Sequence, residues 1–260
     1  MADLLSRDLI VRADGTEIGS FNHACIKGMD MIGLEPFPFH LKLWNLSDSD
    51  FYGLKNAKQV SAGCGNAVLA AGRITEIGRV STKDGSVTEL VFSGDIPLWE
   101  ARVSLAVPAG TALSDTVRRI LEASGTGVSL LSFPGEDPVS LRPQAFYGSA
   151  SECIVTALSA ARARCCLTPA GLCIIPAEGL PVSLHLSEED LLDEPVPLTS
   201  GLLWLRTKPL GWPLGKTATV TWNGEETTGL IVERSLDADT LSGNWQSEII
   251  VAEASALQRG

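Results

Sequence analysis

Basic residues are scarce in this chain, as are histidine, tyrosine and long apolar runs. The 260 residues carry 20 Lys and Arg against 31 Asp and Glu, which gives a formal net charge of −11. Nucleic-acid-binding proteins neutralise phosphates with Lys and Arg, so this balance disfavours a nucleic-acid-binding surface. The charge is compatible with a surface past which DNA slides without sticking, but acidity that only keeps the protein soluble is the simpler explanation.

No apolar run approaches the roughly 20 residues that a membrane-spanning helix requires. Even residues 202–205 (Leu-Leu-Trp-Leu) are followed at once by Arg206 and Lys208. Residues 1–8 lack a basic segment followed by an apolar run, so no signal peptide is expected. The sequence predicts a protein made in the cytoplasm, without a membrane span.

The cysteine spacing does not predict a metal site. No C-x-x-C motif occurs, and Cys165 and Cys166 are adjacent, so their side chains would point to opposite faces of a strand. We expect free, buried thiols in a reducing compartment, and neither a metal nor a cofactor. The cysteines are Cys25, Cys64, Cys153, Cys165, Cys166 and Cys173.

Signatures of nucleophilic catalysis are absent. The three histidines, His23, His40 and His185, lie outside any G-x-S-x-G elbow or cysteine-protease motif. His40 and His185 fall in alternating, strand-like segments, where a solvent-facing or hydrogen-bonded histidine is the simpler interpretation. A hydrolase with a spatial site around either histidine stays open as an alternative. We predict no enzymatic activity and assign no catalytic, cofactor-binding or metal-binding residue.

Residues 210–217 end in Gly-Lys-Thr, as a phosphate-binding P-loop does. The spacing between the glycines is one residue short, and Lys216-Thr217 leads into the β-rich residues 218–220 rather than a helix. The segment therefore predicts a turn that enters a strand.

One pattern occurs twice. Residues 72–76 (Gly-Arg-Ile-Thr-Glu) and 229–233 (Gly-Leu-Ile-Val-Glu) both read G-x-I-x-E, and an apolar run follows each at residues 89–92 and 248–251. A recurring supersecondary unit indicates duplication, so we infer that one β-hairpin is used twice.

The carboxylates of Glu76 and Glu233 also suggest a glycosidase pair. Duplicated positions usually do the same job twice, whereas a general acid and a nucleophile need different environments. We therefore favour structural or interface roles for both residues.

The fold class predicted is mainly β, with two related tube-type β-barrel modules that flank a small α+β domain. The first module spans residues 1–106, a meander without a helix in which Asp14-Gly15 forms a hairpin turn and residues 47–50 cap a short helix or close a turn. The α+β insert spans residues 107–180, and the connector with the second module spans residues 181–260, including an Asn223-Gly224 turn.

Two helices are predicted in the insert. Ser114 is placed at the N-cap of the first, which ends at Gly125. Ser149 begins the second, with Glu152 three residues later forming a capping box.

The tryptophans leave a binding alternative open. They are spread through both β-modules and favour core or interface packing, but exposed ones could form a carbohydrate platform. They are Trp44, Trp99, Trp204, Trp212, Trp222 and Trp245.

Several segments resemble the baseplate hub and tail-tip proteins of tailed bacteriophages, the family that includes late-control-D-type hubs. Residues 39–47 (Phe-His-Leu-Lys-Leu-Trp-Asn-Leu-Ser) resemble a strand that ends in an aromatic-Asn-Leu-Ser turn. The helix at residues 114–123, the aromatic-Gly at residues 146–148 and the hairpin ending at residues 174–176 resemble the inserted domain of that family.

The resemblance implies a structural baseplate hub or tail-tip component of a phage tail or phage-like contractile injection system. It implies a trimer, in which two barrels per chain create pseudo-six-fold symmetry between a six-fold tail tube and a three-fold spike. The expected partners are the tube and spike or tail-tip proteins, in the tail of a virion made in the bacterial host cytoplasm. A distal-tail or tube-adaptor ring is the nearest alternative. The sequence ends at Gly260 without an appended lytic or fibre-binding domain, so any lytic activity is expected of the partners.

Overall fold

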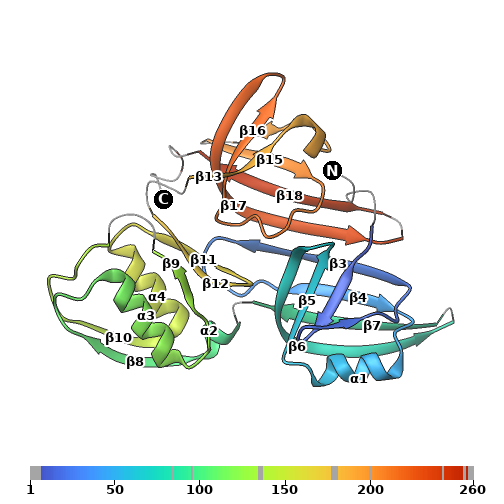
Figure 1. The fold of residues 1–260 in the computed structure, drawn as a ribbon, viewed down its shortest axis with the longest axis horizontal. Helices are drawn as coiled ribbons and strands as arrows, with labels where there is room; N and C mark the ends of the chain where they lie inside the picture. Colours follow the sequence, from blue (N-terminus) through green and yellow to red (C-terminus); the bar gives the residue numbers. More distant parts are fainter. Residues whose placement is uncertain are drawn as a thin grey trace.

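The computed structural model describes residues 7–83, 85–94, 96–133, 137–176, 181–198, 201–241, 243–253 and 256. Within these ranges the chain is mainly β, with its longest helices in a middle α+β segment, so the predicted fold class is confirmed (Figure 1). Among the described residues, no helix combines the length and apolarity needed to cross a bilayer.

The first β-module folds as an antiparallel meander with one helix against it. Asp14 and Gly15 have φ values of 47° and 84°, as a tight two-residue hairpin turn requires. The strand that begins at Phe39 alternates buried and exposed side chains, the period of a half-buried strand. The elements are β1 (Ile10–Ala13), β2 (Thr16–Ile18), β3 (His23–Met31), β4 (Phe39–Trp44), α1 (Asp48–Asn56), β5 (Gln59–Cys64), β6 (Ala67–Thr82) and β7 (Gly85–Ser93).

The expectation of a helix-free region up to about residue 105 is wrong. Helix α1 starts after Ser47, whose side chain accepts a hydrogen bond from the backbone N–H of Asp50, as an N-cap does. Phe51 and the fully buried Leu54 pack against the core of the module. The i, i+3 spacing of these two residues is the helical signal that strand alternation on both sides obscured.

Within the described residues, the middle segment packs three helices against two small sheets. Its elements are α2 (Ile96–Glu100), β8 (Arg102–Val107), α3 (Leu113–Ser124), β9 (Leu130–Ser132), β10 (Gln144–Ser149), α4 (Ala150–Ser159), β11 (Arg164–Thr168) and β12 (Gly171–Ile175). The capping box of Ser149 and Glu152 is confirmed, and α3 ends at Gly125 with φ 64°.

Ser114 is not the N-cap of α3. Ala112 occupies that position and makes no side-chain hydrogen bond. Instead, the carboxylate of Asp137 accepts hydrogen bonds from the backbone N–H and the hydroxyl of Ser114. A distant acid therefore caps this helix, which the local sequence could not indicate.

The second β-module returns to strands after residue 181. Asn223 and Gly224 form the predicted hairpin turn, with φ values of 50° and 79°. Thr217 begins a strand, so the Gly-Lys-Thr segment enters a strand as predicted. The elements are β13 (Val182–Leu186), the 3₁₀ turn η1 (Glu188–Asp190), β14 (Val196–Pro197), β15 (Leu202–Thr207), β16 (Thr217–Trp222), β17 (Glu225–Asp239) and β18 (Trp245–Ala252).

Three main clusters of buried side chains correspond to the three parts of the chain, except that Leu236 and Ala238 of β17 belong to the cluster of the first module. Leu98 and Val103 belong to the middle cluster, although they precede the predicted boundary at residues 106 and 107. We propose a division by these cores, in which the middle unit starts near Ile96. The predicted boundary at residue 180 lies outside the described residues.

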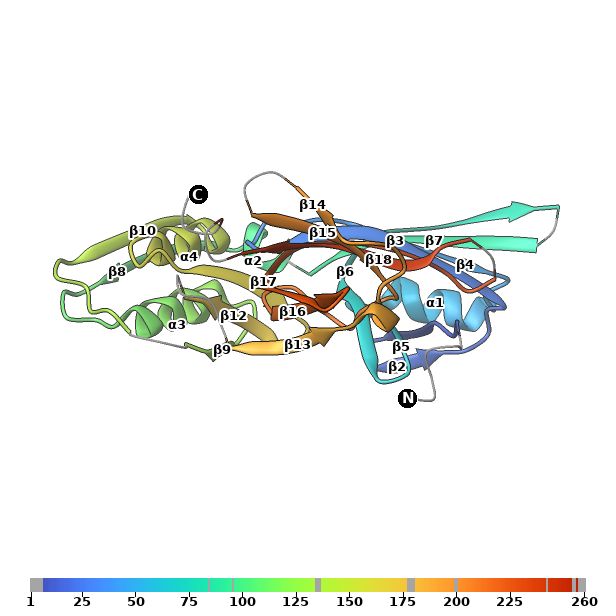
Figure 2. The ribbon, with the colours of Figure 1, turned by 90° about the horizontal axis from the view of Figure 1, so that it is seen from above.

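The two β-modules share one sheet. Its order is β14-β15-β18-β17-β3-β4-β7-β6-β5-β1-β2, with β16 paired to β17 and β13 paired to β16. The modules meet where β17 pairs antiparallel with β3, from Glu233 opposite Met31 to Asp239 opposite Cys25. Figure 2 shows the middle segment at one end of the molecule and the β6–β7 hairpin projecting at the other.

Candidate assembly surface

The duplicated pattern forms the same irregular hairpin in both modules. In β6 the register with β7 shifts at Thr75, and in β17 the register with β18 shifts at Val232. Each bulge falls at the fourth residue of the G-x-I-x-E pattern. A bulge bends a strand and increases its twist, so the repeat preserves a bend as well as a hydrophobic pattern. The prediction of one hairpin used twice is confirmed.

The glycine of each copy lies where another backbone passes closely. A Cβ at Gly72 would lie 2.3 Å from the backbone carbonyl carbon of Ser93, and one at Gly229 would lie 2.5 Å from the carbonyl oxygen of Ala252. Real Cβ atoms essentially never approach so closely. Glycine is therefore required at this point of both hairpins because no side chain fits.

The seam between the modules contains a buried ion pair. Arg234 on β17 stands opposite Asp30 on β3, and its Nη2 lies 2.7 Å from Asp30 Oδ2. The Arg234 side chain is fully buried, and its Nη1 donates to the carbonyl oxygen of Leu69 at 2.7 Å. The guanidinium also lies over the rings of Phe39 and Trp212.

Two opposing effects act on the carboxyl of Asp30. Burial raises the pKa of Asp30, while the charge and hydrogen bond of Arg234 oppose that rise. Sequence reasoning did not single out either residue. A signal was present, because Arg234 follows the second G-x-I-x-E pattern at the place where Ile77 follows the first.

One face of the shared sheet is lined by cross-strand ion pairs. These pairs are Lys27 Nζ–Asp237 Oδ2 at 3.1 Å, Lys42 Nζ–Glu89 Oε1 at 2.8 Å and Arg206 Nη2–Glu248 Oε1 at 3.4 Å. The pairs join β3 to β17, β4 to β7 and β15 to β18. Because side chains alternate between the two faces of a sheet, the paired residues of these six strands all lie on the same side. We call this side the open face. The opposite side of these strands supplies buried residues such as Leu41, Leu205 and Ile249.

The open face carries more acid than base. Among the described residues, the strand registers place six carboxylates on it against four Lys or Arg side chains. The residues are Glu76, Glu89, Glu233, Asp237, Asp239, Glu248, Lys27, Lys42, Arg73 and Arg206. The face therefore has the charge expected of a surface that does not hold DNA phosphates.

The residues considered for catalysis are dispersed over the fold. His23 pairs with Asp239 at 2.9 Å and stacks on Trp44, His40 lies on β4, and His185 lies on β13. Glu76 and Glu233 occupy equivalent places just after the two bulges. Since the same position recurs in each copy, this arrangement favours the structural interpretation of both carboxylates.

Most tryptophans are at least partly buried. The indole N–H groups of Trp212 and Trp222 are inaccessible to solvent, Trp44 stacks on His23, and Trp245 packs against the first core. Trp99 is 45% exposed. A carbohydrate platform on this chain would therefore rest mainly on Trp99.

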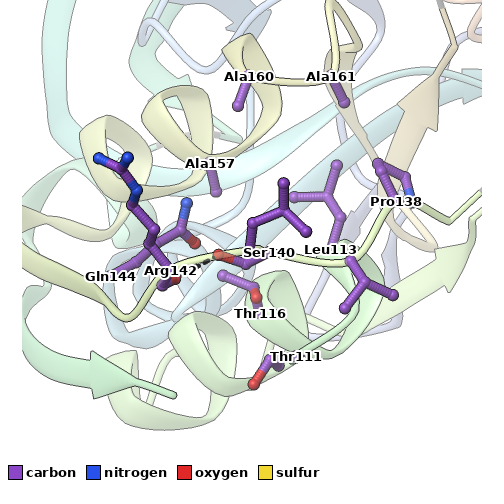
Figure 3. Close-up of a pocket in the computed structure, with 12 residues that line it drawn as sticks. Thr111, Leu113, Thr116, Pro138, Ser140, Arg142, Gln144, Ala157, Ala160 and Ala161 are labelled. Carbon is purple, nitrogen blue, oxygen red and sulfur yellow. Dashed lines mark hydrogen bonds between the residues drawn. The ribbon is translucent and has the colours of Figure 1, made fainter. Parts of the chain in front are cut away.

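A cavity of about 410 Å³ lies in the middle segment, between α3, α4 and the chain at residues 138–144. Within residues 138–144, the hydroxyl of Ser140 donates a hydrogen bond to the carbonyl oxygen of Arg142 at 2.5 Å (Figure 3). Ala157 of α4, the alanines at positions 160 and 161 just after this helix, and the methyl-bearing Thr111 and Thr116 form much of the wall. Among the residues that the structure describes, the lining includes neither a histidine nor a carboxylate that could serve as a general base.

Two thiols face each other where the middle segment meets the second module. Cys166 on β11 is opposite Cys173 on β12, and Cys166 belongs to a small cluster with Ile175 and Leu230. A hydrogen bond from Cys166 lowers the pKa of Cys173 to about 7, against the effect of burial. None of the six cysteines, all of them among the described residues, forms a disulfide; four are buried, and Cys64 and Cys173 are partly buried.

Comparison with solved structures finds 34 similar chains, including the following three. A tail protein from Neisseria meningitidis MC58 has a TM-score of 0.66 and 10% identity, over 94% of this chain and 96% of that chain. The 43 kDa tail protein of prophage MuSo2 from Shewanella oneidensis has a TM-score of 0.67 and 10% identity, over 97% and 98%. The E. coli c3393 protein has a TM-score of 0.65 and 11% identity, over 94% and 76%.

The third of these proteins is described as a component of the type VI secretion system that is structurally similar to the T4 bacteriophage tail proteins gp27 and gp5. No protein-family model matches the present chain, and no curated protein does. Identities of 10–11% show a shared fold rather than a shared function. The chain therefore has the fold of phage tail and secretion-system tail proteins.

Proposed function

We propose that this protein is a non-enzymatic baseplate hub or tail-tip component of a phage tail or phage-like injection system, of the late-control-D type. The observation that carries the proposal is the shared sheet, in which two modules with the same bulged hairpin join through β17 and β3. Such a chain contains two similar modules joined side by side at the seam between β17 and β3. Three chains would then present six units to a six-fold tail tube while keeping a three-fold face for a spike.

The open face becomes the lining of a channel in this proposal. Its excess of carboxylates leaves few cations for DNA phosphates to bind, so DNA could pass without being retained. The partners are the tube protein on one side and spike or tail-tip proteins on the other. The protein acts in the virion tail or injection-particle baseplate after synthesis in the host cytoplasm.

The mass of the purified protein in solution tests the proposal. Light scattering after size exclusion, over a range of concentrations, should give three times the 27.5 kDa chain mass. A hexamer would instead favour a distal-tail or tube-adaptor ring. A persistent monomer that binds glycans, and loses that binding when Trp99 is replaced by Ala, would overturn the proposal in favour of a carbohydrate-binding protein.

A further inference from the structure

As far as the structure describes the chain, part of one edge of β6 in the first module is open, whereas the equivalent edge of β17 in the second module is paired with β3. On the side away from β18, β17 pairs first with β16 and then, from Glu233 onward, with β3. On the side away from β7, β6 pairs with β5 only as far as Arg73. Among the described strands, none pairs with that side of residues 76–82.

The missing partner can be identified from the duplication. β7 corresponds to β18, since each pairs with the bulged strand of its module, and β4 corresponds to β15, since each lies on the next position in the sheet. The strand beyond β4 is β3, and the strand beyond β15 is β14. β14 therefore corresponds to β3, and its outer edge lacks the neighbour that β17 gives to β3.

We propose that the edge of β6 at residues 76–82 pairs antiparallel with β14 of a second copy of this chain. This inference rests on the proposed function, and it assigns the surface through which the chains meet. The template is the seam within the chain, because β6 repeats β17 and β14 repeats β3. The two edges differ from each other, so a second copy leaves the same pair of edges free and repetition closes a ring.

The register follows from the registers within the chain. Val80 lies four residues after Glu76, as Asp237 lies four residues after Glu233. Asp237 therefore corresponds to Val80, and it stands opposite Lys27 in the seam within the chain.

The residue that corresponds to Lys27 is Val196. Lys27 is opposite His40, and Val196 is opposite Trp204. His40 and Trp204 occupy equivalent positions, because the sheet aligns His40 with Glu76 through β7 and Trp204 with Glu233 through β18. Val80 of one chain therefore faces Val196 of the next.

The side chains support this register independently. Val80 is 59% exposed and Val196 is 44% exposed, although both are β-branched apolar residues in strands. Leu198, 42% exposed, would face Gly78 by the same register. An exposed apolar side chain on each of two open edges, directly opposite in the inferred pairing, would be covered by it.

Pro195 and Pro197, on either side of Val196, leave the outer edge of β14 with carbonyl acceptors but no N–H donors at these two positions. The N–H of Leu198 donates to the carbonyl oxygen of Leu202 in β15, so by alternation Pro197 turns its carbonyl to the outer edge. Proline has no N–H to donate, so here β6 donates and β14 accepts. Prolines on an edge also restrict its pairing with unrelated strands.

A disulfide between the inferred partners tests the seam. By the same alternation Val196 is not hydrogen-bonded on its outer side, and such cross-strand pairs have Cα atoms about 4.5 Å apart, within disulfide range. The double variant Val80→Cys/Val196→Cys, mildly oxidised, should give a covalent closed ring that a reductant returns to monomer. Each single variant should stay monomeric on a non-reducing gel, and a mixture of the two should give one dimer.

A mismatched pair shows whether the cross-link depends on register. Val182 on β13 is exposed to a similar degree as Val196, so Val80→Cys/Val182→Cys is the matched control and should not cross-link. Equal cross-linking of this control, or a dimer from Val80→Cys alone, would overturn the seam.

The mass of the assembly separates this inference from the proposed function. A trimer by light scattering without the 80–196 disulfide overturns the seam and leaves the proposed function standing. A covalent hexamer supports the seam and contradicts the trimer. A protein that neither assembles nor cross-links overturns both.

Discussion

Arg234 and Asp30 face each other across the strand pair that joins the two β-modules, with 2.7 Å between Nη2 and Oδ2. Asp30→Ala should destabilise the fold by ~3–5 kcal/mol, because it leaves a fully buried guanidinium without its counter-ion. Urea unfolding measures the change. The double variant Asp30→Leu/Arg234→Met is the control and should recover much of the loss, since it removes both charges. A loss below about 1 kcal/mol in Asp30→Ala would show that the pair does not hold the seam.

The duplicated glycines should tolerate no side chain. Gly229→Ala and Gly72→Ala each place a Cβ against a neighbouring backbone and should cost roughly 1–3 kcal/mol of unfolding free energy. Gly19→Ala is the matched control, because its Cβ meets no atom within 4 Å. Equal stability of all three variants would contradict the close approach.

The Cys173 thiol should titrate near neutrality. Its pKa is lowered to about 7, so the thiolate, the reactive form, grows as the pH rises through that value. The alkylation rate of the Cys173 peptide, followed by mass spectrometry, should be half-maximal near pH 7. Cys166→Ala should shift the midpoint upward, whereas Cys166→Ser keeps a donor and should not. An unchanged midpoint in both variants would remove Cys166 as the cause.

The assembled protein should not retain DNA at low salt. Reversing two carboxylates of the open face, in Glu89→Lys/Glu248→Lys, should produce binding that weakens as salt is added. Glu122→Lys/Glu225→Lys makes the same change in net charge away from that face and is the control. Gel-shift assays with duplex DNA compare the two. Binding by the unmodified protein, or equal binding by both variants, would contradict an acidic channel lining.

A charge at the open edge of β6 should weaken assembly. Val80→Lys puts a cation where the inferred seam places an apolar contact, a change that natural edge strands use against pairing. The concentration for half-assembly should rise about tenfold or more, equivalent to ~1.4 kcal/mol. Val182→Lys is the control and should leave it unchanged. Light scattering across a dilution series measures both.

Local patterns predicted the parts of the fold that local chemistry determines. The Asp14-Gly15 and Asn223-Gly224 turns and the capping box at Ser149 each depend on residues within four positions of one another, and all three form as expected. The bulged hairpins were predictable because their pattern occurs twice in the sequence.

Features that depend on distant contacts were not predictable in this way. The cap of α3 comes from Asp137, 23 residues after Ser114, and the partner of Arg234 lies 204 residues earlier in the chain. The pairing of β17 with β3 is likewise a long-range choice, and alternation alone does not reveal which strand edges meet. For the same reason the sequence predicted two modules but not the open face that they form together.

The covalent fusion of two modules changes how a ring would depend on concentration. In a ring of six modules built from three chains, folding makes every second seam, between β17 and β3, before any two chains meet. Assembly then becomes a third-order rather than a sixth-order process in subunit concentration. The linked modules also meet at the high effective concentration of a single chain. A component needed in few copies per particle could therefore complete its ring at a cellular level at which six separate subunits would stay dispersed.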